Sequence, residues 1–160
     1  MRKPYILVVD DNKITTKLMR KYLESHGFEA MEAYDGIDAL EKIAIRIPDA
    51  IVLDVMMPRM DGYETVKNLR EKLETSEIPI VIVTALNDVP TQIKAIEIGA
   101  NDFLSKPVEE KLLIAKAKIL SHISMQQDRI KFFQNIVANL KNNEVQINDI
   151  DEKIANSDLF

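Results

Sequence analysis

The sequence predicts an α/β protein with a five-stranded, doubly wound parallel sheet. Short apolar runs without polar alternation recur along the chain, which is typical of strands covered by helices on both faces. A segment with helical spacing of apolar residues follows each run, and parallel neighbours need such crossovers. Several runs also end in polar side chains of related chemistry, beginning with Asp54. The alternation defines the fold class, and the strand ends indicate where a site lies.

Each element has its own local signal. The predicted strands are residues 5–9, 28–33, 50–53, 80–83 and 103–104. The helices are predicted from apolar residues at steps of three or four: Ile14, Leu18 and Tyr22; Ile37, Leu40, Ile43, Ala44 and Ile47; Tyr63, Val66, Leu69 and Leu73; Ile93 and Ile96; and Leu112, Leu113, Ile119 and Leu120. Glycine or proline marks most boundaries: Gly27, Gly36, Pro48, Gly62, Pro79, Pro90 and Gly99.

Three aspartates follow two of these strands. Asp10 and Asp11 come after residues 5–9, and Asp54 comes after residues 50–53. Strand ends that precede helices share one edge of a parallel sheet. If strand order reverses between the first and third strands, the three acids meet in a crevice there. The expected order, 2-1-3-4-5, is that of a known doubly wound fold, since apolar spacing alone does not specify strand order.

Three carboxylates in one crevice repel one another and call for a cation. The converging ligands are hard oxygens, and both histidines fall in helices remote in sequence from the acids, so Mg²⁺ suits the site better than Zn²⁺. Simpler interpretations remain open at this point. Asp54 alone could cap a turn, and Asp10 with Asp11 could form a solvated acidic rim.

Two further strand ends complete a candidate anion site. Lys106 supplies a positive charge after the fifth strand, and Pro107 permits a cis bond that would fix its aim. Thr84 ends the fourth strand and offers a hydroxyl together with the amides that follow. A Lys-Pro turn and an ordinary strand threonine are the alternatives. Taken together, a carboxylate nucleophile, a divalent cation, a lysine and a hydroxyl are the parts needed to move a phosphoryl group onto Asp54.

Composition and motif spacing exclude several other functions. With 26 acids against 21 bases and a net charge of −5, the chain lacks the charge for a broad nucleic-acid or anionic-membrane footprint. It has no cysteine, no stretch of membrane-spanning length, and an initial apolar run too short for a signal peptide, so we expect a cytoplasmic protein. The sequence Asp10-Asp11-Asn12 does not match the Asp-x-Asp pair of an aspartyl phosphatase, and the turn lacks the glycines of a nucleotide-binding loop.

Four segments, ILVVDDN, IVLDVMMPRMDGYE, VIVTA and GANDFLSKP, resemble the motifs of the response-regulator receiver domain in the correct order. The resemblance covers residues 4 to about 122, and we expect a receiver domain over 1–122. It implies two-component signalling without turnover of a separate substrate, a histidine kinase or phosphotransfer protein as partner, and Mg²⁺ as cofactor. The implied roles are phospho-acceptor for Asp54, metal binding for Asp10, Asp11 and the backbone carbonyl of Met56, switching for Thr84 and Phe103, and phosphate contact for Lys106.

The resemblance also implies a conformational switch. Thr84 and Phe103 would move together on phosphorylation and reshape the face formed by helix four, strand five and helix five, a population shift driven by contacts to the phosphoryl oxygens. The positions that flank the attacking water in receivers hold Met56 and Leu86, both apolar. Because neither side chain can orient water, slow self-dephosphorylation is expected.

Residues 123–160 are predicted to be a helical extension. Apolar character continues in one heptad register, as expected for a coiled coil: Leu112, Ile119, Gln126, Phe133, Leu140, Ile147 and Ile154. A second register, Ile123, Ile130 and Val137, ends in Glu144 and Asp151, and the cluster Asn139, Asn142 and Asn143 favours a break. We expect a homodimer through this helix. The alternatives are a helix folded back on its own receiver and a linker to an output domain, with Phe160 either a natural end or a cut edge.

A partner-binding or dimerising scaffold in which phosphorylation is secondary remains the rival function.

Overall fold

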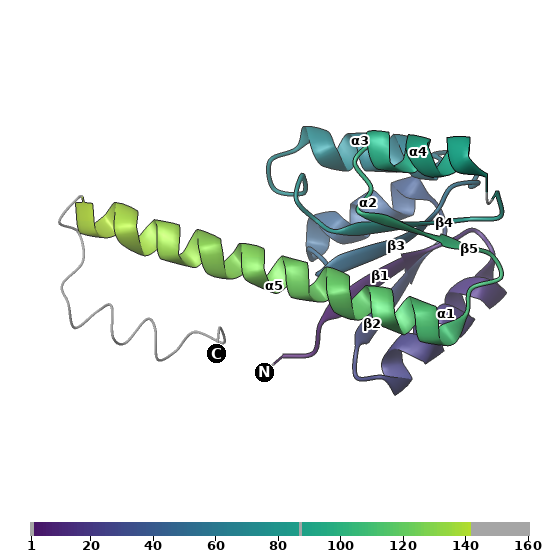
Figure 1. Cartoon of the computed structure of the whole chain (residues 1–160), viewed down its shortest axis with the longest axis horizontal. Helices are drawn as coiled ribbons and strands as arrows, with labels where there is room; N and C mark the ends of the chain where they lie inside the picture. Colours follow the sequence, from purple (N-terminus) through teal and green to yellow (C-terminus); the bar gives the residue numbers. More distant parts are fainter. Residues whose placement is uncertain (1, 87, 142–160) are drawn as a thin grey trace. The chain divides into compact units, whose positions relative to one another are not determined.

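The computed structural model describes residues 2–86 and 88–141 (Figure 1). Its elements alternate from strand to helix in chain order: β1 Tyr5–Val9, α1 Lys13–Ser25, β2 Glu29–Ala33, α2 Gly36–Ile45, β3 Ala50–Asp54, α3 Gly62–Glu71, β4 Ile80–Thr84, α4 Val89–Glu97, β5 Asp102–Ser105 and α5 Glu110–Lys141. The chain divides into two compact units, Lys3–Ser124 and a second comprising Met1–Arg2 with Met125–Phe160. The first unit contains the whole sheet.

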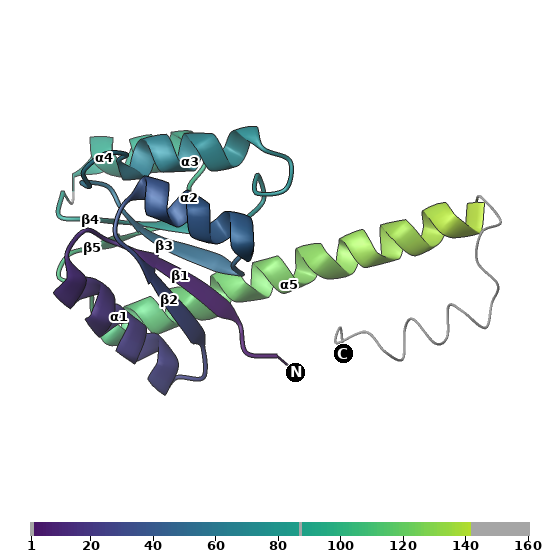
Figure 2. The same cartoon turned by 180° about the vertical axis from the view of Figure 1, so that it is seen from behind.

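All five strands are parallel and lie in the order β2-β1-β3-β4-β5, which confirms the predicted fold class and strand order. Helices α2, α3 and α4 cover one face, and α1 with the first part of α5 covers the other (Figures 1 and 2). Alternate strand residues therefore enter different cores: Ile6 and Val8 pack with α1 and α5, whereas Leu7 and Val9 pack with the other three helices. Every residue of β1, β3 and β4 is buried, as their unbroken apolar sequences predict.

Helix α1 forms where the apolar spacing predicts it, but the residues of that spacing do not make its buried face. Ile14 is 81% exposed and Leu18 is also exposed, while the buried row is Thr16, Met19 and Leu23. Thr16 is accommodated there because its hydroxyl donates to the Lys13 carbonyl and to a Glu32 carboxylate oxygen. Because one residue of the buried row is a threonine, the spacing of apolar residues alone does not identify the buried face of α1.

Helices α2 and α3 end earlier than predicted. Ile47 lies beyond α2 and is exposed, because the cap residue Arg46 is extended (φ −149°, ψ 120°) and Pro48 disfavours helix at the residue before it. Leu73 lies beyond α3 and is 88% exposed.

In α4 the expected apolar residues Ile93 and Ile96 are exposed, and Ala95 is the buried residue. The terminal residues of these apolar rows therefore contribute little to the core.

Helix α5 runs for 32 residues without a break up to Lys141. Asn139 lies inside it, and the predicted continuation through Asn142, Asn143, Ile147 and Ile154 lies outside the described residues. Among the residues that the structure describes, no helix combines the length and apolar character needed to cross a membrane.

Candidate functional site

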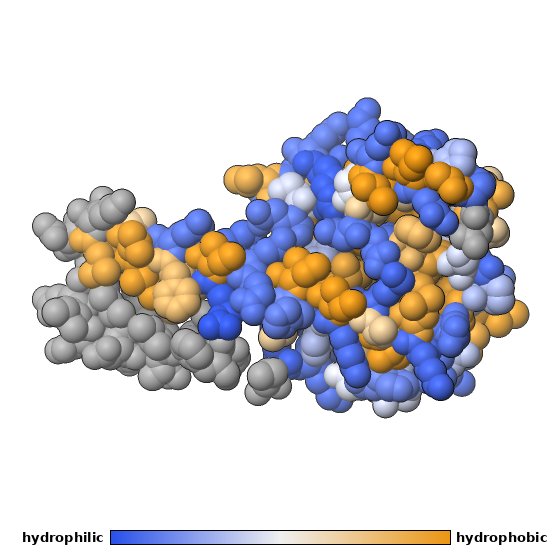
Figure 3. All heavy atoms as spheres, viewed as in Figure 1, coloured by the Kyte–Doolittle hydropathy of each residue, from blue (hydrophilic) through white to orange (hydrophobic). Residues whose placement is uncertain are grey.

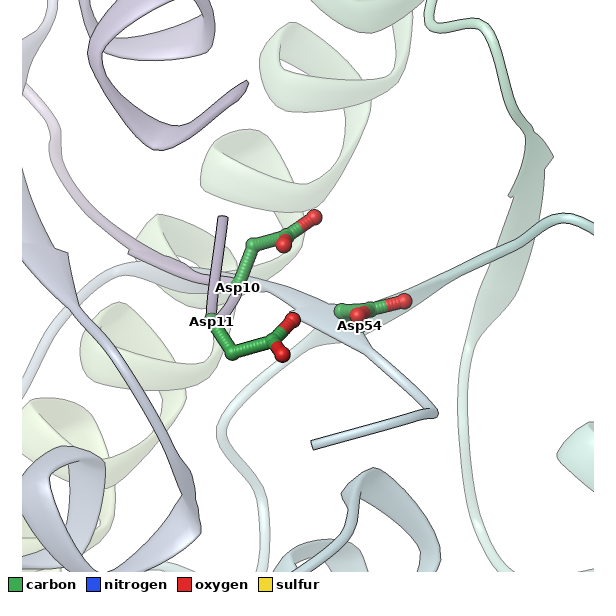
Figure 4. Close-up of side chains that lie close together, drawn as sticks. All are labelled: Asp10, Asp11 and Asp54. Carbon is green, nitrogen blue, oxygen red and sulfur yellow. The ribbon is translucent and has the colours of Figure 1, made fainter. Parts of the chain in front are cut away.

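The structure brings together the three acids that the sequence singled out. Asp10 and Asp11 directly follow β1, and Asp54 is the last residue of the neighbouring strand β3, whose Leu53 pairs with Val9. One carboxylate oxygen from each acid lies within 4.8 Å of those of the other two (Figure 4). The three acids meet where the strand order reverses, as expected for a doubly wound sheet.

Lys106 joins this group from the end of β5. The Lys106–Pro107 peptide bond is cis. The backbone of Lys106 is held in place because its N–H donates to the Thr84 carbonyl at 2.9 Å. Its ammonium Nζ lies 2.8 Å from Asp10 Oδ2 and 3.1 Å from Asp54 Oδ1. One ammonium therefore contacts two carboxylates that come from different strands.

The surroundings of Asp54 and Lys106 shift the pKa values of these two groups. Burial, followed by the nearby charge of Asp10, raises the pKa of Asp54, and contact with Lys106 offsets part of that rise. Burial alone would lower the pKa of Lys106, but the adjacent carboxylates of Asp10 and Asp54 outweigh this effect and raise the pKa above its ordinary value. One lysine thus leaves the charge of the carboxylate group only partly balanced.

The donor set fits a hard divalent cation. Asp10 is 0% exposed, and its Oδ2 has no hydrogen-bond donor in acceptable geometry although Lys106 Nζ is close to it. Buried polar atoms ordinarily have such a partner. Its second oxygen, Oδ1, accepts from the Asn12 N–H at 2.8 Å. Carboxylate oxygens of this kind are suitable ligands for Mg²⁺.

The remaining predicted residues surround the acid group. Thr84 lies one residue beyond Val83, the register partner of Asp54, and its hydroxyl accepts from the Leu86 N–H at 3.0 Å. Met56 lies in the loop that follows Asp54, and its side chain is exposed. Phe103 is half-buried in β5, two strands from Asp54, and packs on the core beneath α2, α3 and α4. The structure therefore places Phe103 outside the acid cluster.

The contacts that hold the loop between β3 and α3 were not predictable from the sequence. Arg59 has a left-handed backbone (φ 64°), and its guanidinium contacts the buried carboxylate of Asp35. Burial raises the pKa of Asp35, but hydrogen bonds from the Asp38 N–H and from Arg59 outweigh this effect and hold that pKa below its ordinary value. Neither residue directly follows an apolar strand, so neither carries the signal that marked the other site residues.

The fold and this acid group define a class: doubly wound α/β proteins with a cluster of acidic side chains at the switch point. The family model for the response regulator receiver domain matches residues 6–118, and the chain belongs to that family. The resemblance found in the sequence is thereby confirmed, and the chain contains a receiver domain of two-component response regulators.

Individual relatives agree with this assignment. The chain is 38% identical over 126 residues to response regulator PleD of Caulobacter vibrioides, covering 79% of this chain and 28% of PleD. It is 39% identical over 123 residues to response regulator MprA of Mycobacterium ulcerans, covering 77% of this chain and 52% of MprA. The chain thus spans about half or less of these relatives.

Solved structures give the same result. A putative response regulator from Chloroflexus aurantiacus superposes with a TM-score of 0.73 at 34% identity, over 76% of this chain and 99% of that one. Chemotaxis response regulator CheY4 of Vibrio cholerae gives a TM-score of 0.70 at 29% identity, over 74% of this chain and 98% of that one. The similarity therefore extends over nearly the full length of both solved structures.

Proposed function

We propose that Asp54 accepts a phosphoryl group from a histidine kinase or phosphotransfer protein, with Mg²⁺ held by Asp10, Asp11, Asp54 and the Met56 carbonyl. The observation that carries this proposal is the convergence of three carboxylates within 4.8 Å, with Lys106 bound to two of them. Membership of the receiver family supports phosphoryl acceptance. The roles of the individual residues are part of the proposal.

In the proposed transfer, a carboxylate oxygen of Asp54 forms a bond to phosphorus while the bond from phosphorus to the donor's imidazole nitrogen breaks. The imidazole leaves with the electron pair of that bond and takes up a proton. Lys106 neutralises charge on the phosphoryl oxygens from a position already 3.1 Å from the Asp54 carboxylate. Mg²⁺, when bound, supplies further charge neutralisation and alignment of the phosphoryl group.

Thr84 connects the chemistry to a conformational change. Its hydroxyl oxygen accepts from the Leu86 N–H in this structure, and in the proposal the hydroxyl turns to donate to a phosphoryl oxygen. Phe103 and the face formed by α4, β5 and α5 then shift in population toward a second state. The sparse burial of α4, where Ala95 is the buried residue, supports mobility of that face.

The C-terminal part of α5 is proposed to dimerise. An apolar stripe, visible along this helix in Figure 3, consists of the exposed residues Ile130, Phe133, Val137 and Leu140. Phe133 and Leu140 continue the heptad register of Leu112 and Ile119, which are also exposed, whereas Ile130 and Val137 belong to the second register. A second copy offers the same register, so parallel pairing buries the stripe of both chains. This stripe is the observation that favours the second candidate function, a dimerising scaffold.

The proposal therefore divides the chain into a receiver at 1–122 and a helical extension at 123–160. It describes a cytoplasmic signalling protein that does not bind nucleic acid or membranes directly. The net charge of −5 supports the absence of a nucleic-acid footprint. Its own chemistry is limited to self-catalysed phosphotransfer and dephosphorylation, with no separate substrate turned over.

Incubation with a small acyl phosphate, with and without Mg²⁺, tests the proposal by intact mass spectrometry. Wild-type protein should gain one phosphoryl group only when Mg²⁺ is present, and Asp54→Asn should gain none. Labelling that persists in Asp54→Asn, or that needs no metal, contradicts the assignment. Light scattering on the same samples separates the candidates, because a pure scaffold would be dimeric without any phosphoryl uptake.

A further inference from the structure

The loop between β3 and α3, residues 55–61, is fixed at both ends against the acceptor strand. The Val55 N–H donates to the Val83 carbonyl at 3.3 Å, and the Gly62 N–H donates to the Val55 carbonyl at 2.9 Å. Gly62 lies so close that a Cβ atom there would be 2.3 Å from the Asp54 carbonyl oxygen. The loop therefore leaves and returns at the same point of the sheet.

The far side of the loop is tied to the start of α2. The Gly36 N–H donates to the Met60 carbonyl at 3.1 Å. Arg59 contacts Asp35 Oδ2 through Nε at 2.7 Å and through Nη2 at 2.5 Å. Asp35 is 5% exposed, and its other oxygen caps α2 by accepting from the Asp38 N–H at 2.9 Å. Both oxygens of this carboxylate thus have fixed partners.

The Asp35–Arg59 ion pair also holds backbone that is otherwise unfavourable. Arg59 has φ 64°, a region that side chains other than glycine and asparagine rarely occupy. At Gly36 a Cβ atom would lie 2.1 Å from Thr65 Oγ1, so the start of α2 is pressed against α3. The anchor for Arg59 is therefore a rigid part of the fold, and the loop must conform to it.

Met56 lies between these two fixed points, and its carbonyl is a proposed metal ligand. We infer that Asp35 and Arg59 are positioning residues, whose ion pair fixes the loop so that the Met56 carbonyl is presented to the cation. This inference rests on the proposed function, because it concerns the same metal site. By this inference the Asp35–Arg59 ion pair, which lies outside the acid cluster, controls the affinity for the divalent cation.

A purely electrostatic role and a positioning role for Arg59 predict opposite changes in Mg²⁺ affinity when Arg59 is replaced. Arg59 is a cation, so by charge alone its loss would favour Mg²⁺ binding. If it positions the loop, its loss weakens Mg²⁺ binding. Arg59→Gly is the suitable variant because glycine adopts positive φ without strain, which leaves the backbone geometry available. The direction of the change in Mg²⁺ affinity therefore distinguishes the two mechanisms.

The experiment is a calorimetric titration with MgCl₂ of wild type, Arg59→Gly, Asp35→Asn and the double variant. Partners that orient metal ligands typically affect metal affinity by about 10- to 100-fold, and we expect about tenfold weaker binding in each single variant. The double variant should be no weaker than the singles, since both remove one ion pair. Arg59→Lys should restore part of the affinity. Arg46→Gln, which removes a cation paired with exposed Glu29, is the control and should bind Mg²⁺ like wild type.

Two further readouts separate positioning from loss of fold. Thermal unfolding without metal should show a folded Arg59→Gly protein, and its labelling rate at saturating Mg²⁺ should approach that of wild type. If Arg59→Gly does not fold, Arg59→Asn replaces it, because asparagine also tolerates positive φ. Unchanged or tighter Mg²⁺ binding in the folded variant, or additive effects in the double variant, overturns the inference. Wild-type protein that binds no Mg²⁺ overturns the proposed function itself.

Discussion

Replacing Lys106 with methionine should destabilise the metal-free protein more than any ordinary lysine substitution. Lys106 is 28% exposed on its side chain and is the cation beside Asp10 and Asp54, whose side chains are 0% and 5% exposed. At about 3 Å and an effective dielectric constant near 20, each contact has a Coulomb energy of about 5 kcal/mol before solvation is counted.

Solvation reduces this figure. Removing one partner of a buried ion pair typically costs about 3–5 kcal/mol, and the partial exposure of Lys106 places the expected loss at about 2–3 kcal/mol. For a domain of this size the loss corresponds to a fall in Tm of about 10 °C. Thermal unfolding followed by circular dichroism, at neutral pH without divalent ions, measures it directly.

Lys116→Met provides the matched control. The ammonium of Lys116 lies 2.5 Å from Asp102 Oδ2, but the Asp102 side chain is 34% exposed. The expected loss of unfolding free energy is therefore below about 1 kcal/mol. If Lys106→Met and Lys116→Met show equal Tm values, the charge of Lys106 does not stabilise the buried carboxylates of Asp10 and Asp54. Mg²⁺ should restore more stability to Lys106→Met than to the control.

The pH dependence of the same variant has a definite sign. A raised pKa means that folded Asp54 holds its proton more tightly than the unfolded chain does, so stability falls as pH rises through the folded pKa. Without Lys106, which offsets part of the rise, that pKa is higher still. The deficit of Lys106→Met relative to wild type should therefore shrink as pH falls toward the ordinary aspartate pKa, about 3.9. A deficit that grows on acidification contradicts this explanation.

Three other variants, two of them double substitutions, test separate parts of the mechanism and the fold. Met56→Asn with Leu86→Glu should speed loss of the phosphoryl group at least about tenfold by giving water a hydrogen-bonding partner; a decay of intact mass equal to that of wild type would refute this. Gly62→Ala should cost about 3 kcal/mol or more in urea unfolding, since its Cβ would meet the acceptor's carbonyl oxygen at 2.3 Å; a neutral effect would contradict the close approach. Phe133→Asp with Leu140→Asp should weaken dimerisation at least roughly a hundredfold in light scattering while leaving phosphoryl uptake intact, and a wild-type chain that stays monomeric with and without phosphorylation would instead favour the folded-back helix.

The sheet and the position of the acid group were predictable because both depend on local sequence. Unbroken apolar runs specify buried parallel strands, and residues directly after such strands share one edge of the sheet. Asp10, Asp11, Asp54 and Lys106 all satisfy that rule, and the structure brings them together. Strand order was the exception, because apolar spacing does not encode it.

Other features depend on tertiary contacts that the sequence does not display. Thr16 faces the core because Glu32 and a backbone carbonyl satisfy its hydroxyl, so the apolar spacing that predicts α1 does not identify its buried row. The Asp35–Arg59 ion pair joins residues 24 positions apart through a non-glycine residue with positive φ. No composition or periodicity marks such a contact, since it arises only once α2 has packed beside the loop.

The most direct test of the central claim is to locate the phosphoryl group on the chain. Borohydride reduces an aspartyl phosphate to homoserine, which tandem mass spectrometry can assign to a single residue. After reaction with an acyl phosphate and Mg²⁺, we expect homoserine at position 54 and unmodified aspartate at positions 10 and 11. Homoserine at position 10 or 11, or none anywhere in a folded protein that binds Mg²⁺, would contradict the assignment of Asp54 as the acceptor.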